Sequence, residues 1–253
     1  MKIYALAPNE NWICDRFVKE WNENNPNSVA SSPYDCDVLW LLADWCWNRI
    51  DYGKIDRTKT KIIASVHHIV PSKFNNLKSY REWKARDELI DAYHVPCEKT
   101  KLQIANLTNK QIYDFPFWTN SKMWQQLDKK ICRSNLSLPD DKFIIGSFQR
   151  DTEGSDLISP KLEKGPDLLV DTIEKISKTK NVHVLLGGWR RQYVINRLEN
   201  LNISYTYNEL PNFDVLNQMY NALDLYLVTA RYEGGPQAIV ECGLTKTPII
   251  STD

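Results

Sequence analysis

The 253-residue sequence has almost no glycine in its first half: only Gly53 precedes Gly146, and the other glycines follow. Glycine permits tight turns and close approach of the backbone to a ligand. A loop that cradles phosphate must therefore lie in the second half. Tryptophan shows the reverse distribution, with Trp189 the only one of nine after Trp124. Such large flat side chains suit core packing, sugar stacking or a membrane interface.

Other absences exclude whole classes of protein. There is no excess of either charge, with 32 basic and 32 acidic side chains, which argues against a general nucleic-acid binder. No apolar run approaches the roughly 20 residues that cross a bilayer, and the first segment is too short and polar for a signal peptide. The six cysteines form no C-x-x-C pair and do not cluster with the four histidines. This pattern predicts reduced thiols, no zinc site and a cytoplasmic protein.

Hydrophobic periodicity predicts alternating strands and helices. Continuous apolar strands between helices are typical of parallel sheets buried on both faces. The predicted strands are residues 2–7, 38–42, 61–66, 92–96, 111–115, 143–148, 182–186, 204–207, 225–229 and 249–251. The predicted helices are residues 12–21, 77–90, 99–105, 165–176, 189–198, 213–222 and 236–244.

Two successive arrays of this kind predict an α/β protein with two Rossmann-like domains that face each other across a cleft. We expect one domain over residues 1–125 and a second over residues 140–253. Residues 120–139 are predicted to be helical and then polar, and to form the passage between them. In such folds ligands bind at the carboxyl ends of the strands.

The strongest motif lies at residues 230–252. A predicted buried strand runs into Glu233, then Gly234, Gly235 and Pro236, and then a helix that contains Glu241. Proline suits the first helical position, and glycines allow the free N–H groups of a helix start to approach an anion. Two carboxylates at this spacing could hold vicinal hydroxyls, as on a ribose or a hexose. The alternative is an ordinary strand-to-helix turn with two solvated glutamates.

This segment resembles the E-x7-E signature of the family 4 (group 1) retaining glycosyltransferases of the GT-B fold. Seven residues separate Glu233 from Glu241. Upstream, Phe143–Arg150 resembles the family's strand that ends in a glycine and an arginine, and Lys164-Gly165 resembles its lysine-glycine pair. The likeness is clear from residue 143 onward and fainter in the first half, where residues 63–67 resemble a strand ending in histidine.

The resemblance implies a role for each matching residue. Arg150 and Lys164 would neutralise the diphosphate of a nucleotide-sugar donor, Glu241 would bind the ribose hydroxyls, and Glu233 would lie against the transferred sugar. His67 would touch that sugar from the first domain, and with Glu233 it would form the catalytic pair. The alternative for His67 is a hydrogen-bonded histidine at a strand end. The other implied donor-binding residues are Gly146, Gly188, Gly234, Gly235, Pro236 and Gln237.

The implied reaction is retaining transfer from a UDP-, GDP- or ADP-linked sugar to a saccharide or lipid-linked acceptor, as in polysaccharide biosynthesis. Family members need no metal or cofactor, because side-chain cations and a helix start receive the negative charge of the leaving diphosphate. A D-x-D occurs once, as Asp35-Cys36-Asp37 in the first half, outside the segments that resemble the family. Attack on the face from which the diphosphate departs would need no protein nucleophile.

The sequence departs from the family in two places. The turn after the first strand, residues 7–12, lacks the family's glycines, so the acceptor side cannot be assigned beyond Asn9 or Glu10 as candidates. The chain also stops at Asp253, where family members continue, which suggests a truncated or unusually short member. A non-catalytic nucleotide-sugar-binding protein is therefore an alternative. A nicotinamide-dependent oxidoreductase is disfavoured because no G-x-G-x-x-G follows a strand.

Residues 49–86 are strongly basic, with ten lysines or arginines against three acidic residues. Trp45 and Trp47 precede most of these charges, and Trp83 lies among them. A basic, aromatic surface suits an anionic acceptor or peripheral contact with a membrane. A solvated charged face fits the same pattern.

Overall fold

The computed structural model describes residues 1–10, 13–154 and 156–252. It divides the chain into two compact units, Met1–Trp118 and Thr119–Asp253. The predicted helix start at Trp12 and the final residue, Asp253, lie outside the described residues.

The first unit is a five-stranded parallel sheet in the order β1-β2-β3-β4-β5. The strands are β1 (Ile3–Leu6), β2 (Val38–Leu41), β3 (Lys61–Ser65), β4 (Ala92–Val95) and β5 (Gln111–Asp114). The helices are α1 (Ile13–Asn24), η1 (Asp44–Arg49), η2 (Tyr52–Lys54), α2 (Pro71–Phe74), α3 (Leu77–Leu89) and α4 (Glu98–Ala105).

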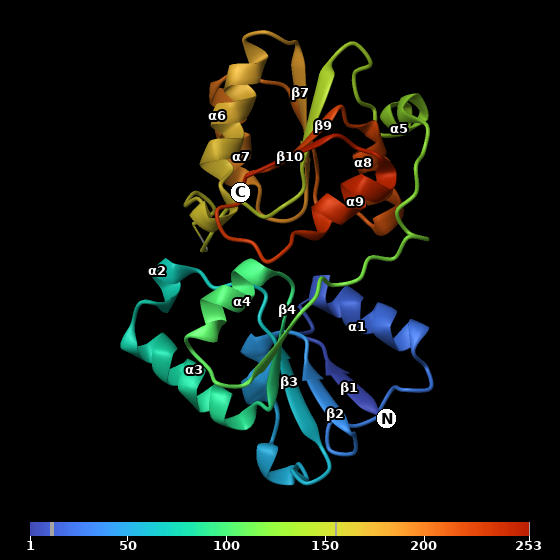
Figure 1. The fold of residues 1–253 in the computed structure, drawn as a ribbon. Helices are drawn as coiled ribbons and strands as arrows, with labels where there is room; N and C mark the ends of the chain where they lie inside the picture. Colours follow the sequence, from blue (N-terminus) through green and yellow to red (C-terminus); the bar gives the residue numbers. More distant parts are fainter. Residues whose placement is uncertain (11–12, 155, 253) are drawn as a thin grey trace. The chain divides into compact units, whose positions relative to one another are not determined.

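Helices cover both faces of this first sheet (Figure 1). On one face Trp83 of α3 is buried and stacks on Tyr93 of β4, with ring centroids 5.4 Å apart. On the other face Phe17 of α1 stacks on Phe117, and Trp40 of β2 contacts Trp118 edge-on. Most tryptophans of the first half thus pack the core, which is why its strands can be continuous apolar runs.

The second unit is a parallel sheet in the order β10-β9-β6-β7-β8. The strands are β6 (Phe143–Ser147), β7 (Val182–Gly187), β8 (Tyr205–Asn208), β9 (Leu225–Val228) and β10 (Ile249–Ser251). The helices are α5 (Lys129–Asn135), η3 (Leu162–Lys164), α6 (Pro166–Ser177), α7 (Gln192–Asn200), α8 (Phe213–Ala222) and α9 (Gln237–Thr245).

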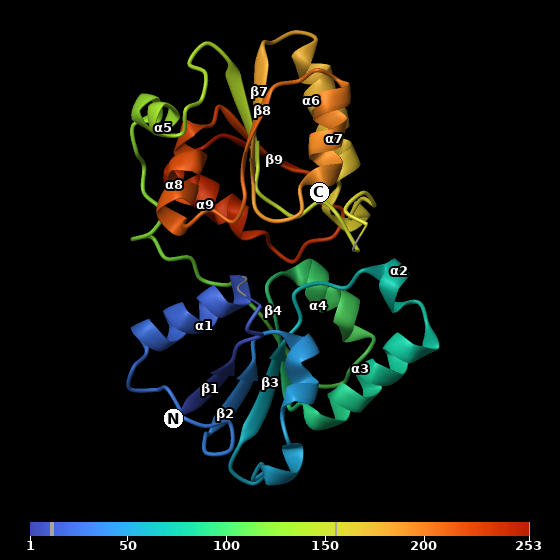
Figure 2. The same ribbon diagram turned by 180° about the vertical axis from the view of Figure 1, so that it is seen from behind.

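The strand order of this sheet fixes where a ligand should bind. The chain starts at the central strand β6, moves outward through β7 and β8, and then returns to β9 and β10 on the other side. Helices α6 and α7 cover one face, and α5, α8 and α9 cover the other (Figure 2). The order reverses between β6 and β9, and open α/β sheets bind ligands at the carboxyl side of such a switch point. Both sheets have the predicted Rossmann-like α/β architecture.

Several predicted helix boundaries were wrong; for example, α1 ends at Asn24 and not at Trp21. Helix α7 begins at Gln192 and not at Trp189, because Arg190 has a left-handed backbone (φ 56°) that prolongs the turn after β7. Pro236 has an extended ψ of 128° and precedes α9 as its N-cap, so it is not the first helical residue. Residues 121–124 form a turn and a bend and not a helix, helped by the Asn120 carboxamide oxygen, which accepts from the Lys122 amide at 3.0 Å.

All six cysteines are free thiols, and all except Cys97 are buried. Burial raises the pKa of Cys14 and of Cys242 to about 12, so both stay protonated and pack as small apolar groups. Among the described residues, no three His, Cys, Asp or Glu side chains gather as metal ligands would. Within the same residues, every helix is too short or too polar to cross a bilayer.

Candidate functional site

The predicted donor residues of the second unit collect on loops at the carboxyl edge of its sheet. Arg150 lies just after β6, Lys164 ends η3, Gly188 follows β7, and residues 233–236 lie between β9 and α9. Carboxyl ends of parallel strands meet at one edge, so residues far apart in sequence come together there. The structure thus brings the matching motif segments of the second half to one place.

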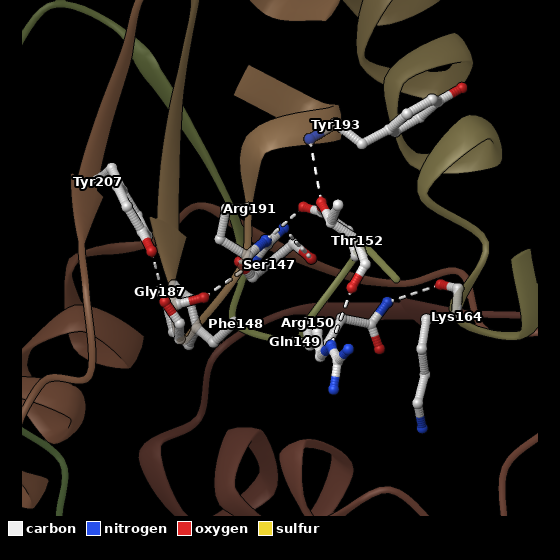
Figure 3. Close-up of polar contacts among 12 residues, drawn as sticks. Ser147, Phe148, Gln149, Arg150, Thr152, Lys164, Gly187, Arg191, Tyr193 and Tyr207 are labelled. Atoms are coloured by element: carbon white, nitrogen blue, oxygen red, sulfur yellow. Dashed lines mark hydrogen bonds and ion pairs between the residues drawn. The ribbon is translucent and has the colours of Figure 1, made fainter. Parts of the chain in front are cut away.

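Arg150 is held by its own loop. Its Nε donates to the Thr152 carbonyl at 2.8 Å, and its guanidinium carbon lies 5.3 Å from the centre of the Trp189 ring. Burial and the neighbouring Arg190 lower the pKa of Arg150, yet an arginine stays charged at neutral pH after such a shift. In Figure 3 the Arg150 guanidinium and the Lys164 side chain extend to the same side of this loop. The edge therefore presents two cations together.

Lys164 is fixed at both its backbone and its side chain. Its carbonyl accepts from the Gln149 side-chain amide at 2.8 Å, which ties η3 to the loop after β6. Its Nζ forms an ion pair with Glu233 Oε1, and the two side chains are 15% and 20% exposed. The sequence predicted both residues near the donor but gave no sign that they contact each other.

Close backbone approach explains two of the glycines. Gly165 has φ 60°, and a Cβ there would lie 1.8 Å from the Thr229 carbonyl oxygen, so only glycine lets η3 pass the end of β9. This approach carries Lys164 to the loop with Glu233. A Cβ on Gly146, within β6, would lie 2.3 Å from Leu223 Cδ1, so packing against Leu223 already requires a glycine there.

The start of α9 completes this edge. Gly234 is buried, whereas Gly235 is exposed and has φ 92°. The Gln237 carboxamide oxygen accepts from the Thr119 hydroxyl at 2.7 Å, which fixes the first helical residue. The free N–H groups and the macrodipole of this nine-residue helix favour an anion at its N-terminus.

Glu241 lies one turn further along α9 and is only 4% exposed. Its Oε2 accepts from the Tyr220 hydroxyl at 2.7 Å. Burial, aided by the Glu241 charge, raises the pKa of Tyr220 well above its ordinary value, so the hydroxyl stays protonated and donates. The Tyr220 ring contacts Phe148 of the loop after β6, with centroids 4.9 Å apart. Since Glu233 is ion-paired and Glu241 is buried, neither is a solvated surface glutamate.

His67 lies in the first unit, two residues beyond β3. Its Nε2 is 2.8 Å from the Leu42 carbonyl oxygen and 3.5 Å from Cys14 Sγ. A carbonyl can only accept, so Nε2 carries a proton and donates to Leu42. The ring stacks on Phe117 at 4.9 Å. His67 is therefore a strongly oriented histidine at the carboxyl edge of the first sheet.

Sequence reasoning missed a buried ion pair beside Arg150. Asp151 and Arg191 are 1% and 0% exposed, and Arg191 Nε lies 2.6 Å from Asp151 Oδ2. Charged side chains are almost never fully buried unless they are paired. An Asp and an Arg forty positions apart give no pattern that predicts this contact.

The basic segment 49–86 loses much of its excess charge in the fold. At least six of its ten cations have a carboxylate within 4 Å, and four of the acids in these six pairs come from outside the segment. The pairs are Arg49–Glu10, Lys54–Asp51, Arg57–Asp91, Lys59–Asp35, Lys78–Glu82 and Arg86–Asp44. These contacts favour the interpretation as a charged, solvated face.

Comparison with solved structures gives the same two-sheet architecture at low sequence identity. Anabaena HepE, crystallised with UDP and glucose, has a TM-score of 0.78 at 11% identity over 99% of this chain and 80% of its own. Sucrose-phosphate synthase from Thermosynechococcus elongatus has a TM-score of 0.65 at 16% identity over 94% and 59%. A glycosyltransferase from Rickettsia africae has a TM-score of 0.64 at 16% identity over 98% and 64%.

Comparison at the sequence level matches one part of the chain. Curated proteins give no significant match. The family described as Glycosyl transferases group 1 matches residues 159–253, the stretch that contains Lys164, Glu233 and Glu241. The resemblance stated from the motifs is thus confirmed. Residues 159–253 carry the features of group 1 glycosyl transferases, and the chain as a whole has the two Rossmann-like sheets of the GT-B fold.

Proposed function

We propose that this chain transfers a sugar, with retention of configuration, from a nucleoside diphosphate sugar to a saccharide or lipid-linked acceptor. The observation that carries the proposal is the pair of cations, Arg150 and Lys164, on loops at the switch-point edge of the second sheet, where α9 also begins. Lys164 and the helix lie within the stretch that matches the group 1 family. Crystals of Anabaena HepE, which shares the fold, hold UDP and glucose.

The chemistry requires positive charge where the leaving group departs. As the glycosidic bond breaks, the nucleoside diphosphate gains negative charge, and preorganised donors at that position stabilise the transition state. Arg150, Lys164 and the free amides at the start of α9 supply such donors. We therefore propose transfer that needs no metal ion.

The remaining predicted residues act on the sugar and the nucleoside. Retention without a protein nucleophile follows if the acceptor hydroxyl attacks from the side on which the diphosphate leaves and passes its proton to a phosphate oxygen. Glu241 would bind the ribose hydroxyls, and Glu233 would lie against the transferred sugar. His67, oriented by the Leu42 carbonyl, would contact the sugar from the first unit.

Binding and turnover together test the proposal. Calorimetry with UDP, GDP, ADP and NAD should give binding to at least one nucleoside diphosphate in preference to NAD. Arg150→Ala and Lys164→Ala should each weaken that binding by about 1.5–3 kcal/mol, a loss typical of a charge-assisted contact, with much less effect on the bare nucleoside. If both variants bind the diphosphate as tightly as the parent, the assignment is wrong. Binding without transfer to any acceptor would favour a non-catalytic nucleotide-sugar-binding protein.

A further inference from the structure

Arg191 joins the carboxyl ends of two neighbouring strands. It is fully buried, and its Nη1 donates to the Gly187 carbonyl at 2.8 Å and to the Ser147 carbonyl. Ser147 and Gly187 are the last residues of β6 and β7. Arg191 therefore fixes both strand ends at the point where the loop with Arg150 and the turn with Trp189 begin (Figure 3).

Asp151 links Arg191 to the backbone next to Arg150. One carboxylate oxygen pairs with Arg191 Nε, and the other accepts from the Thr152 hydroxyl at 2.7 Å. The Asp151 amide donates to the Arg190 carbonyl at 3.2 Å, and its own carbonyl accepts from the Lys161 amide at 2.7 Å. The adjacent Arg150 is bound through its Nε to the Thr152 carbonyl. The backbone on both sides of Arg150 is thus tied to the Asp151–Arg191 pair.

Stability alone is a weak reason for such a pair. Taking two charges out of water costs several kcal/mol per ion, and well-packed apolar side chains often replace a buried pair without loss. Arg191 also donates to the carbonyls at the two strand ends, and its Nη2 donates to the Ser147 hydroxyl at 3.4 Å. The bonds of the pair hold the loop that contains Arg150 in one position relative to the ends of β6 and β7.

We propose that Asp151 and Arg191 are positioning residues that hold Arg150 where it meets the donor diphosphate. The proposal rests on the proposed function, because it assigns to Arg150 a phosphate as its ligand. Neither Asp151 nor Arg191 contacts that phosphate in this scheme, since both are buried and bonded within the protein. Their removal should therefore act on diphosphate recognition through Arg150 and spare the nucleoside.

The same unit contains a matched control. Arg133 pairs with Asp224 at 2.6 Å and donates through Nε to the Ala222 carbonyl at 3.0 Å, and its side chain is 9% exposed. Asp224 also accepts from the Ile144 amide at 2.8 Å, at the start of β6. This second Arg–Asp pair, in which the Asp224 side chain is 22% exposed, thus lies at the amino edge of the sheet, away from the candidate site. Its loss should lower stability without changing ligand recognition.

The experiment compares Asp151→Asn with Asp224→Asn in the full chain. Affinities for UDP, GDP and ADP and for their nucleosides are measured by calorimetry at a temperature where circular dichroism shows each variant folded. Asp151→Asn should weaken binding of the preferred diphosphate by about tenfold, the scale of one charge-assisted contact, and should leave the nucleoside affinity unchanged. Asp224→Asn should change neither. Arg191→Lys, which cannot reach all the carbonyls, should resemble Asp151→Asn.

The results distinguish a failure of the proposed function from a failure of the positioning role. If the parent binds no nucleoside diphosphate, the proposed function fails before any variant is compared. If the parent binds one and Asp151→Asn binds it equally well, or loses diphosphate and nucleoside affinity alike, the positioning role is refuted. Thr152→Val serves if Asp151→Asn does not fold, because it removes the hydroxyl bonded to Asp151 without stranding a buried charge. It should give a smaller loss of the same selective kind, and no loss would also refute the role.

Discussion

The amine of Lys164 and the carboxylate of Glu233 form an ion pair at the carboxyl edge of the second sheet. Gly165 makes this contact possible, because its lack of a Cβ lets the end of η3 pass the Thr229 carbonyl. The cation proposed for the diphosphate is thus already paired with an acid of the adjacent motif. In the proposed reaction, a bound diphosphate would replace Glu233 as the partner of Lys164.

This relationship predicts opposite effects of one substitution on binding and on turnover. Glu233→Gln removes the competing charge while keeping the side-chain shape, so nucleoside diphosphate affinity should rise. A gain of about 1–2 kcal/mol, roughly five- to thirtyfold, is the scale of a partly buried charged contact. Turnover should fall, because Glu233 is proposed to lie against the transferred sugar.

Calorimetry with the free diphosphate and initial rates with the nucleotide sugar measure the two effects. Glu174→Gln is the control: it makes the same change of charge on α6, where Glu174 pairs with the exposed Lys178 at 3.5 Å. It should alter neither quantity. Unchanged or weaker diphosphate binding by Glu233→Gln would contradict the competition between Glu233 and phosphate.

Sequence patterns predicted the architecture well, because the relevant signals are local and repeated. Each apolar run, such as residues 61–66 and 182–186, has the length and composition of a strand buried on both faces. The predicted ends of helices and turns were less accurate. The turn after β7 continues to Arg191 because Arg190 adopts a left-handed backbone, which an arginine seldom does and which no local pattern announces.

The second prediction concerns a buried polar chain in the first unit. Trp40 Nε1 donates to Ser65 Oγ at 2.9 Å, Ser65 Oγ lies 2.9 Å from His94 Nδ1, and His94 Nε2 lies 2.9 Å from the Phe115 carbonyl oxygen. Every group is satisfied only if His94 is neutral, with its proton on Nε2. Burial lowers the pKa of His94 from 6.5 to about 4.

The stability of the protein should therefore fall in acid. Between pH 6.5 and pH 4 the unfolded chain binds a proton at His94 that the folded chain does not, so the free energy of unfolding decreases as pH falls. The full loss from this group is about 3 kcal/mol. Denaturant titrations of the parent and of His94→Gln at several pH values check this. The variant should be less stable at pH 7 and should show a shallower loss over that range; parallel curves would contradict the assignment.

The third prediction concerns metal ions. The charges proposed to stabilise the leaving diphosphate belong to Arg150, Lys164 and the start of α9, so transfer or donor hydrolysis should continue in excess EDTA. The rate with EDTA is compared with the rate after addition of Mn²⁺ or Mg²⁺. Activity that disappears with the chelator and returns with manganese would show that a metal, and not these groups, carries the leaving-group charge.

The site itself was predictable only as a set of residues. Spacing placed Glu233 and Glu241 on either side of a helix start, and the resemblance added Arg150 and Lys164. Sequence could not show which side chains contact each other, because those contacts depend on loops from different strands. The Lys164–Glu233 pair spans 69 positions and the Asp151–Arg191 pair spans 40. The partner of Glu241, Tyr220, looked like an ordinary core aromatic of α8.

The final prediction separates the two glutamates through that partner. Glu241 is proposed to hold the ribose hydroxyls, and the Tyr220 hydroxyl bonds to its Oε2 at 2.7 Å. Glu241→Ala should weaken binding of every nucleotide and of the bare nucleoside, by about 1–3 kcal/mol. Tyr220→Phe keeps the ring and the carboxylate but removes the bond that orients them, so it should give a smaller loss of the same kind. Glu233→Ala should instead leave nucleoside affinity unchanged, because Glu233 is assigned to the sugar and to Lys164.

Affinities for nucleoside, nucleoside diphosphate and nucleotide sugar in the three variants give the comparison. Nucleoside binding that depends on Glu233 and not on Glu241 would reverse the direction in which the donor lies across the edge of the sheet, while nucleoside binding that depends on neither would remove the ribose from the α9 site altogether.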